Sequence, residues 1–373
     1  MSLMELKEGM ILGEDVINKQ GIIMLKEGTK LNDVLLKRVK MLHYSDKIYI
    51  LVEIQIKDKF VNENLNDLVQ VYEEEQKHNE KRIKKRRKYA SEVAKLANEL
   101  KEHIYIENID EEQFNKKLKH IIFDIKKLAN DCYNIFSVIL SDSSVDDYLY
   151  EHTVRSTIVS YLLAKWMKVE EEDQNIIIKA SLLKDLGKLK TPKEILDKPG
   201  KLLPNEFKEI KKHPLFSYAS VKNLSSISKK ECEIILQHHE KEDGSGYPLG
   251  LKNEEISLLS KIVTIGDMFT AMTSNRIYAE KNSPFKVIEE FQRFSFDKLH
   301  MGVVMTFIKN FTEYYINAKV KLSNDMIGQI VRLDMSEISK PLIKLSNGQF
   351  LDLKVSRNIE ILDVMDKVYM ENY

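Results

Sequence analysis

The chain has 373 residues, of which 43% are hydrophobic, so it is long enough for two or three domains with a sizeable core. Lysine plus arginine equals aspartate plus glutamate at 58 each, which leaves no global charge to attract a nucleic acid polymer or a membrane. The sequence has no signal peptide and no apolar run near the roughly 20 residues that span a bilayer, and its two cysteines lie far apart, so we expect a cytoplasmic protein.

Residues 1–57 predict a small β-rich domain. Glycines separate short apolar runs, such as those at 22–25 and 48–51, and a helix is expected near 32–42. We expect this domain to contact signalling proteins.

Residues 58–111 predict a charged helical connector. An acidic run at 73–75 precedes a basic run at 81–88, and residues 62–101 contain neither glycine nor proline. The basic run alone is compatible with a nucleic acid or an anionic lipid surface, but the acidic neighbours favour a solvated helix face. A connector or a dimerisation helix is therefore expected, and the latter would make the protein a homodimer.

Apolar helices carrying isolated polar groups follow. His152 lies in an amphipathic stretch that runs to Trp166, and Asp185 closes the apolar run 181–183 ahead of Gly187. His213 stands before a proline, which favours a helix end.

The segment 238–248, HHEKEDGSGYP, is the most informative in the chain. Two adjacent histidines close an apolar helix, and a glycine-rich acidic loop follows. Imidazole nitrogens are good ligands for transition metals, and glycine lets the backbone turn sharply. Glu240, Glu242 and Asp243 are candidates to orient the two rings, as metal-bound histidines require, with a solvated loop as the alternative.

Asp267 lies alone in the apolar helix 262–272, and a buried carboxylate needs a partner. Asp185 to His213 and His239 to Asp267 are each 28 residues apart, about one helical hairpin, so packed helices would direct these groups to one centre. Histidines and carboxylates converging in a helix bundle suit iron, manganese or zinc in a two-metal arrangement.

Residues 319–373 predict a small β-rich C-terminal extension. Apolar runs at 320–323, 328–333 and 341–345 are expected to be strands, and Asn347-Gly348 is a favourable hairpin turn.

The motifs HHEKEDGSGYPLGL (238–251), EHTVRS (151–156) and IGDMFTAMTSNRIY (265–278) resemble the HD-GYP group of the HD metal-dependent phosphohydrolases. The resemblance covers roughly 112–318 and implies a mainly α fold, an HD-type helical bundle, with the β-rich domains at its two ends. It also implies hydrolysis of the bacterial second messenger cyclic di-GMP to pGpG or GMP.

Residue by residue, the resemblance implies six metal ligands, with Asp185 bridging two ions. They are His152, Asp185, His213, His238, His239 and Asp267. It further implies that Asp185 and Lys188 are catalytic, and that the substrate is bound by Lys188, Gly246, Tyr247, Pro248 and Arg276. Two divalent ions, iron or manganese, would lower the pKa of a water and neutralise the phosphodiester.

Three positions depart from the family pattern. Lys184 replaces the histidine of the His-Asp pair, Ala279 replaces a basic residue, and Tyr148 stands where three-metal members carry a glutamate, so we expect at most two ions. At an effective dielectric of about 20, a unit charge 4 Å from a dication costs roughly 8 kcal/mol. Lys184 must therefore swing away, lose its proton or sit where one ion would otherwise be, which would leave a single ion.

Two hypotheses from different classes follow. In the first, the chain is a working phosphodiesterase that tolerates Lys184. In the second, it is a degenerate member that binds cyclic di-GMP, or a partner protein, without hydrolysis. A third interpretation is an HD hydrolase that acts on another nucleotide. The GYP loop disfavours it, because this loop resembles that of the cyclic dinucleotide group. The ligand set favours the enzyme, whereas Lys184 and Ala279 favour the second hypothesis.

Overall fold

A computed structural model describes residues 10–12, 16–17, 23–25, 29–31, 50–51, 88–105, 110–130, 148–198, 200–274, 283–334 and 337–367. The chain divides into two compact units, Met1–Asn79 and Glu80–Tyr373, and each is described by itself.

The first unit contains two small antiparallel pairs of strands. Strand β1 (Ile11–Leu12) pairs with β4 (Ile50–Leu51), and β2 (Val16–Ile17) pairs with β3 (Ile23–Leu25). Strands β3 and β4 arise from the two apolar runs that predicted β structure. The helix expected near 32–42, and the charged runs at 73–75 and 81–87, lie outside the described residues.

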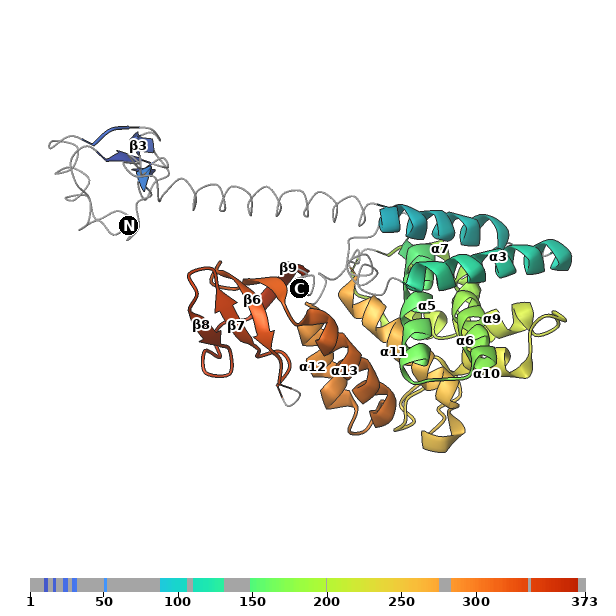
Figure 1. Ribbon diagram of the computed structural model, residues 1–373. Coiled ribbons are helices and arrows are strands. Elements are labelled where there is room, and N and C mark those ends of the chain that lie inside the picture. The colour runs from blue at the N-terminus through green and yellow to red at the C-terminus, as the bar shows by residue number, and fades with distance from the viewer. Residues whose placement is uncertain are drawn as a thin grey trace. The chain divides into compact units, whose positions relative to one another are not determined.

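The second unit is built around one central helix, α5 (Tyr148–Trp166), whose residues 151–164 are all buried (Figure 1). Helices α3, α6, α11 and α13 pack against it. The helices of this unit include residues 88–103, α3 (Glu111–Ala129), α6 (Glu171–Leu183), α7 (Lys193–Leu196), α8 (Pro204–Ile210), α9 (His213–Val221), α10 (Lys229–Gln237), α11 (Leu258–Thr273), α12 (Pro284–Phe294) and α13 (Met301–Tyr315), with 3-10 turns η2 (Leu186–Lys190) and η3 (Asn253–Glu255).

Helix α11 comes very close to α5, because Gly266 faces it. A Cβ at Gly266 would lie 2.2 Å from Ser160 Oγ and 3.0 Å from the Ser156 carbonyl oxygen, so no larger residue fits this crossing. Ser257 begins α11 by accepting a hydrogen bond from the Ser260 N–H, the usual role of an N-cap serine. This crossing brings the polar residues of the two helices within bonding distance of each other.

The C-terminal strands form a five-stranded antiparallel sheet in the order β8-β7-β6-β5-β9. They are β5 (Ala318–Leu322), β6 (Ile327–Arg332), β7 (Leu342–Leu345), β8 (Phe350–Asp352) and β9 (Ile361–Lys367). Side chains of β5 alternate between buried and exposed, and Val320 and Leu322 join the same apolar core as the helices. The turn between β7 and β8 contains Gly348 at a positive φ of 82°, as the Asn-Gly pair predicted.

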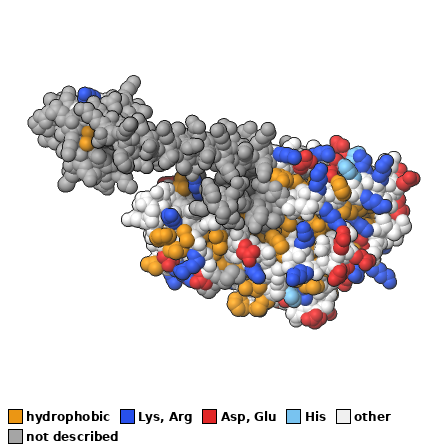
Figure 2. Space-filling view, viewed as in Figure 1, with side chains coloured by type: hydrophobic (Ala, Val, Ile, Leu, Met, Phe, Trp, Pro, Cys, Tyr) orange, Lys and Arg blue, Asp and Glu red, His pale blue; other side chains and the backbone are white. Residues whose placement is uncertain are grey.

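The predicted fold class is confirmed: the protein is mainly α, with small antiparallel sheets toward its N- and C-terminal ends. The bounds of the four domains stay predictions. Among the described residues, no helix is both long and apolar enough to cross a membrane. Figure 2 shows basic and acidic side chains interspersed over the helical face in view, in keeping with their equal numbers in the sequence.

Candidate metal centre

The structure brings the six predicted ligands together from five places in the chain. His152 comes from α5, Asp185 follows α6, His213 begins α9, the two adjacent histidines follow α10, and Asp267 lies in α11. They form two overlapping groups, within each of which the ligand atoms lie within 4.8 Å of one another. We call Asp185, His213, His238 and His239 the histidine group, and His152, Asp185 and Asp267 the carboxylate group.

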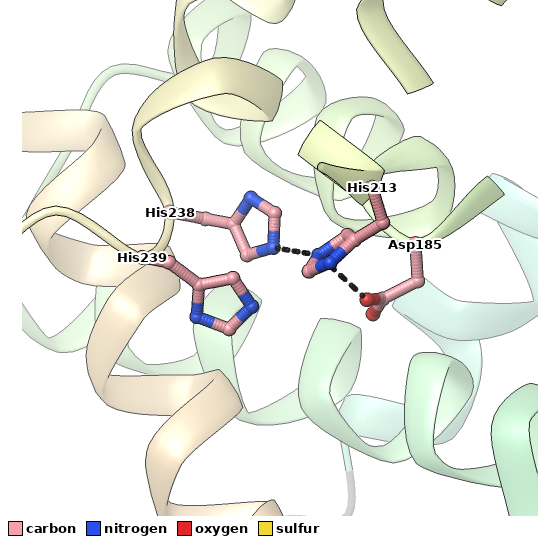
Figure 3. Close-up of side chains that lie close together, drawn as sticks. All are labelled: Asp185, His213, His238 and His239. Atoms are coloured by element: carbon pink, nitrogen blue, oxygen red, sulfur yellow. Dashed lines mark hydrogen bonds and ion pairs between the residues drawn. The ribbon is translucent and has the colours of Figure 1, made fainter. Parts of the chain in front are cut away.

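Two histidines of the histidine group face each other through the nitrogens that would bind an ion (Figure 3). The Nε2 atoms of His213 and His238 are 3.3 Å apart. The Nδ1 atom of each ring lies 2.8 Å from a backbone carbonyl oxygen, of Ile210 and Ile235 respectively, to which it donates. This bond fixes the tautomer, so both Nε2 atoms carry lone pairs directed at the same space. A cation held by both nitrogens would satisfy these lone pairs.

Burial keeps these rings neutral, which is the form that binds metals. It lowers the pKa of His213 to about 3, with Lys188 acting in the same direction. It lowers the pKa of His238 to about 4, although Asp185 opposes the change. Burial also holds the pKa of His239 well below its usual value. The donor set therefore needs no deprotonation near neutral pH.

His239 completes the group beside the glycine-rich loop. Its ring stacks on that of Tyr247, with centroids 4.7 Å apart, and lies edge-on to His213 at 5.0 Å. The loop returns close to the histidines because Gly246 packs on the backbone, where a Cβ would lie 2.4 Å from the Cα atom of Glu240. Pro248 follows in the same turn.

Glu240 anchors this loop rather than a histidine ring. Its carboxylate accepts hydrogen bonds from the backbone N–H groups of Leu249, Gly250 and Leu251 at 2.6–3.1 Å. Glu242 pairs with Lys261 at 2.9 Å, and Asp243 accepts from the Ser245 N–H at 2.8 Å. The rings of His213 and His238 are oriented instead by the backbone carbonyls of Ile210 and Ile235, which sequence patterns do not reveal.

The carboxylate group lies at the crossing of α5 and α11. His152 Nε2 is 3.0 Å from Asp267 Oδ1, and burial lowers the pKa of His152 while Asp267 opposes that change. The other ring nitrogen of His152 is buried and has no hydrogen-bond partner among the described residues.

Lys184 extends into the carboxylate group. Its side chain is fully buried, and its ammonium contacts Asp185 Oδ2 and lies 3.1 Å from Asp267 Oδ1. Burial favours the neutral amine, but these two carboxylates outweigh it and raise the pKa of Lys184 above its ordinary value. The sequence left three arrangements open for Lys184. In the structure its ammonium lies between the two carboxylates, where one ion would otherwise be.

Asp185 is bracketed by two ammonium groups. Lys184 binds Oδ2, and Lys188 lies 2.6 Å from Oδ1. Burial disfavours the charged carboxylate, but these ammonium groups outweigh burial and hold the pKa of Asp185 well below its usual range. The turn that carries Asp185 is fixed by Ser217, whose hydroxyl accepts from the Gly187 N–H and donates to the Lys184 carbonyl oxygen, both at 2.7 Å.

Two residues named in the sequence analysis cannot be compared with the structure, and one residue of the site was not named there. Arg276 and Ala279 lie outside the described residues. Ser156 was missed from the sequence, although it stands one helical turn after His152 on the same face of α5, where such spacing makes side chains neighbours.

The fit of a divalent ion differs between the two groups. The histidine group offers three neutral imidazoles and one ionised carboxylate, a set that suits zinc, iron or manganese. The carboxylate group offers two carboxylates and one imidazole, but the Lys184 ammonium is already bonded to both carboxylates.

Comparison with known proteins agrees with this cluster. Residues 135–298 match the HD domain family, and this range contains all six ligands. This segment of the chain is similar to HD domains. It is 30% identical over 202 residues to a cyclic di-GMP phosphodiesterase of Pseudomonas aeruginosa, covering 54% of this chain and 48% of the relative. It is 36% identical over 131 residues to a 3'3'-cGAMP-specific phosphodiesterase of Vibrio cholerae, covering 35% of this chain and 28% of the relative.

A solved structure also has a similar fold. An HDG"Y"P protein from Bdellovibrio bacteriovorus superposes with a TM-score of 0.52, covering 83% of this chain and 98% of that protein, at 16% identity, a likeness of fold alone. The resemblance to HD-GYP proteins is thereby confirmed. The chain spans 48% of the length of the Pseudomonas relative and 28% of the length of the Vibrio relative.

Proposed function

We propose that the chain is a metal-dependent phosphodiesterase that hydrolyses cyclic di-GMP to pGpG, GMP or both. The facing Nε2 atoms of His213 and His238, 3.3 Å apart and backed by backbone carbonyls, carry the proposal, because they form a preorganised ion site. The cyclic dinucleotide phosphodiesterases among the relatives support the substrate class.

Each residue of the histidine group has a defined task in this proposal. His213, His238, His239 and Asp185 would hold one ion, iron or manganese. That ion would supply charge neutralisation at the phosphodiester and acidify a water. Lys188 keeps 18% of its side chain exposed beside Asp185, so its ammonium is placed to stabilise negative charge that develops on the phosphate.

The glycine-rich loop would bind the nucleotide. Tyr247 presents its ring next to His239, and the Lys211 ammonium lies 5.2 Å from the centre of that ring. An aromatic ring beside a cation suits a purine base and its phosphate. We assign Gly246 and Pro248 to shaping this loop and Arg276 to a phosphate, the latter from the family motif alone.

The test is cleavage of cyclic di-GMP by protein loaded with Mn²⁺ or Fe²⁺, with products separated by chromatography and ions counted in the same sample. 3'3'-cGAMP, run in parallel, reports which cyclic dinucleotide is preferred. Asp185→Ala is the control for contaminating activity and should abolish turnover, since Asp185 belongs to both ligand groups. Cleavage that persists in this variant would contradict the proposal.

Binding of cyclic di-GMP without turnover would favour a different function, that of a non-hydrolysing receptor or interaction scaffold. The burial of Lys184 against two of the ligands is the observation behind this alternative. Contacts of the N-terminal domain with signalling proteins, a homodimer and a cytoplasmic location stay predictions.

A further inference from the structure

We infer that the Lys184 ammonium is a built-in cation that takes the place of a second metal ion, so that the chain binds one divalent ion, in the histidine group. The inference rests on the proposed function only in taking the histidine group as an ion site. It concerns the ion count and the identity of the second positive charge, and it is independent of which nucleotide is cleaved.

The ammonium of Lys184 is fully satisfied where it lies. A protonated amine has three N–H donors, and three acceptors surround this one: Asp185 Oδ2, Asp267 Oδ1 at 3.1 Å and Ser156 Oγ at 3.1 Å. The Ser156 hydroxyl donates its own proton to the Thr153 carbonyl oxygen at 3.1 Å, which leaves a lone pair for Lys184. Such a match of donors and acceptors is a binding site for an ammonium group.

Burial and backbone hydrogen bonds hold Lys184 in this position. Its side chain is 0% exposed, its N–H donates to the Ala180 carbonyl oxygen at 2.8 Å, and its own carbonyl oxygen accepts from Ser217 at 2.7 Å. The backbone is therefore fixed on both sides, and withdrawal of the ammonium would leave a charge in a close-packed interior.

Lys188 provides the contrast within the same cluster. Its ammonium also contacts Asp185, on Oδ1 at 2.6 Å, the oxygen that lies 3.5 Å from His213 Nε2. An ion in the histidine group would compete with Lys188 for this oxygen. With 18% of its side chain exposed, Lys188 has access to solvent and can move aside. The histidine group is thus open to an ion, whereas the carboxylate group is not.

The charges of the cluster agree with one ion. Two carboxylates, Asp185 and Asp267, already face the two ammonium groups of Lys184 and Lys188. With Lys188 moved aside, one dication and the Lys184 ammonium exceed the two carboxylates by one charge, whereas a second dication would add two more beside a fixed ammonium, with strong repulsion at short range. A lysine ammonium supplies one positive charge and no open coordination position, so Lys184 compensates the carboxylates but offers nothing to a phosphate.

The test is the number of Mn²⁺ ions bound per chain, measured by native mass spectrometry and elemental analysis at saturating Mn²⁺. Electron paramagnetic resonance provides a second readout, because isolated Mn²⁺ and a spin-coupled pair give different spectra. We expect one ion and the isolated spectrum for the wild-type chain. In Lys184→His, where an imidazole replaces the ammonium, we expect two ions and the coupled spectrum.

Lys179→His is the matched control. Lys179 lies in α6, at whose C-terminal end Lys184 stands, and its ammonium pairs with the buried Glu231 carboxylate at 2.8 Å, so the substitution removes a lysine–carboxylate pair outside the cluster. This variant should keep one ion. Should Lys184→His fail to fold, Lys184→Gly also removes the ammonium and should bind a second, weaker ion.

Two ions in the wild-type chain, or one ion in every Lys184 variant that folds, would overturn the inference. Failure of the proposed function gives a different pattern, because a chain that counts one ion and gains a second in Lys184→His, but cleaves no cyclic dinucleotide, keeps the inference and loses the phosphodiesterase.

Discussion

Asp185 has two unlike neighbourhoods, and the difference between them determines how the cluster binds cations. Toward the histidine group, His213 and His238 present neutral ring nitrogens to one space, with backbone carbonyls behind them. Toward the carboxylate group, the same carboxylate meets the buried ammonium of Lys184, which also binds Asp267. One half is arranged to receive a cation, and the other half contains one.

This comparison shows that a set of ligand-type residues does not define the number of ions by itself. Asp185, His152 and Asp267 have suitable spacing for an ion, yet the neighbour of Asp185 in the sequence fills the same position. The second positive charge of such a site can be a lysine ammonium of the chain instead of a second metal ion. The predictions that follow treat the two halves separately, from the largest expected effect to the smallest.

Acidification should destabilise the ion-free protein through the histidine group. The pKa of His213 is about 3 and that of His238 about 4, both below the unfolded value of roughly 6.5. Between these values the unfolded chain binds more protons than the folded chain, so stability falls as the pH falls. Each histidine should cost about 2 kcal/mol between pH 7.5 and pH 5, or about 4 kcal/mol together.

Denaturant unfolding of the ion-free protein at several pH values measures this loss. His213→Asn should remove the contribution of His213, about 2 kcal/mol, because the asparagine does not titrate. Saturating Mn²⁺ should oppose the loss at mild acidity, since it binds the neutral rings. A free energy of unfolding that is flat between pH 7.5 and 5 would mean that these rings are not held neutral.

Asp267→Asn should destabilise the carboxylate group while leaving the histidine group able to bind its ion. Lys184 would remain buried with one carboxylate fewer, and breaking a buried pair in this way costs about 3 to 5 kcal/mol. Asp173→Asn is the control, because its pair with Lys230 is partly exposed and should matter by less than about 1 kcal/mol.

The measurement is the free energy of unfolding, together with the Mn²⁺ count. Equal losses of stability in the two variants would contradict the buried role of Asp267. Loss of all bound Mn²⁺ from Asp267→Asn would show that the two halves do not act separately.

The sequence predicted the helical bundle and the convergence of its polar residues for physical reasons that are local. A carboxylate in the apolar run of Asp267 had to find a partner, and the tandem histidines had to share a helix end. Strands β5, β6 and β7 were predicted by short apolar runs, and the turn after β7 by the Asn347-Gly348 pair, whereas β9 was not predicted. These features depend on patterns that extend over a few residues.

Contacts between residues that are distant in the sequence could not be predicted from the sequence. Lys184 had three arrangements open to it, and the choice depends on Ser156 and Asp267, which come from two other helices that meet at Gly266. Glu240 was considered as an acceptor for a histidine ring, but the return of the glycine-rich loop offers it three backbone N–H groups instead. Neither contact follows from spacing along the chain.

Removing one histidine from each half should lower the affinity of the protein for Mn²⁺ by different amounts. His213→Ala deletes a ligand of the histidine group and should weaken Mn²⁺ binding by at least about 100-fold, more than the loss of a supporting contact. His152→Ala deletes a ligand of the carboxylate group, which Lys184 already fills, and should change the affinity by less than about 10-fold. Isothermal titration with Mn²⁺ measures both, and similar weakening in the two variants would mean that His152 serves the bound ion.

The smallest effect is expected from Ser156→Ala, and it reports directly on the three acceptors around Lys184. The variant keeps both carboxylates but leaves one N–H of the buried ammonium without its acceptor, which should cost about 1 to 3 kcal/mol of folding free energy.

Ser160→Ala is matched to it: Ser160 is equally buried, lies one turn further along α5, and donates to the Ser156 carbonyl oxygen at 2.8 Å, an oxygen within the helix. Its loss should cost less than about 1 kcal/mol, since such a bond within a helix adds little. The difference in free energy of unfolding between the two variants therefore isolates the contact between Ser156 and Lys184. If both variants lose the same amount, the ammonium does not depend on Ser156, and the cradle for Lys184 consists of the two carboxylates alone.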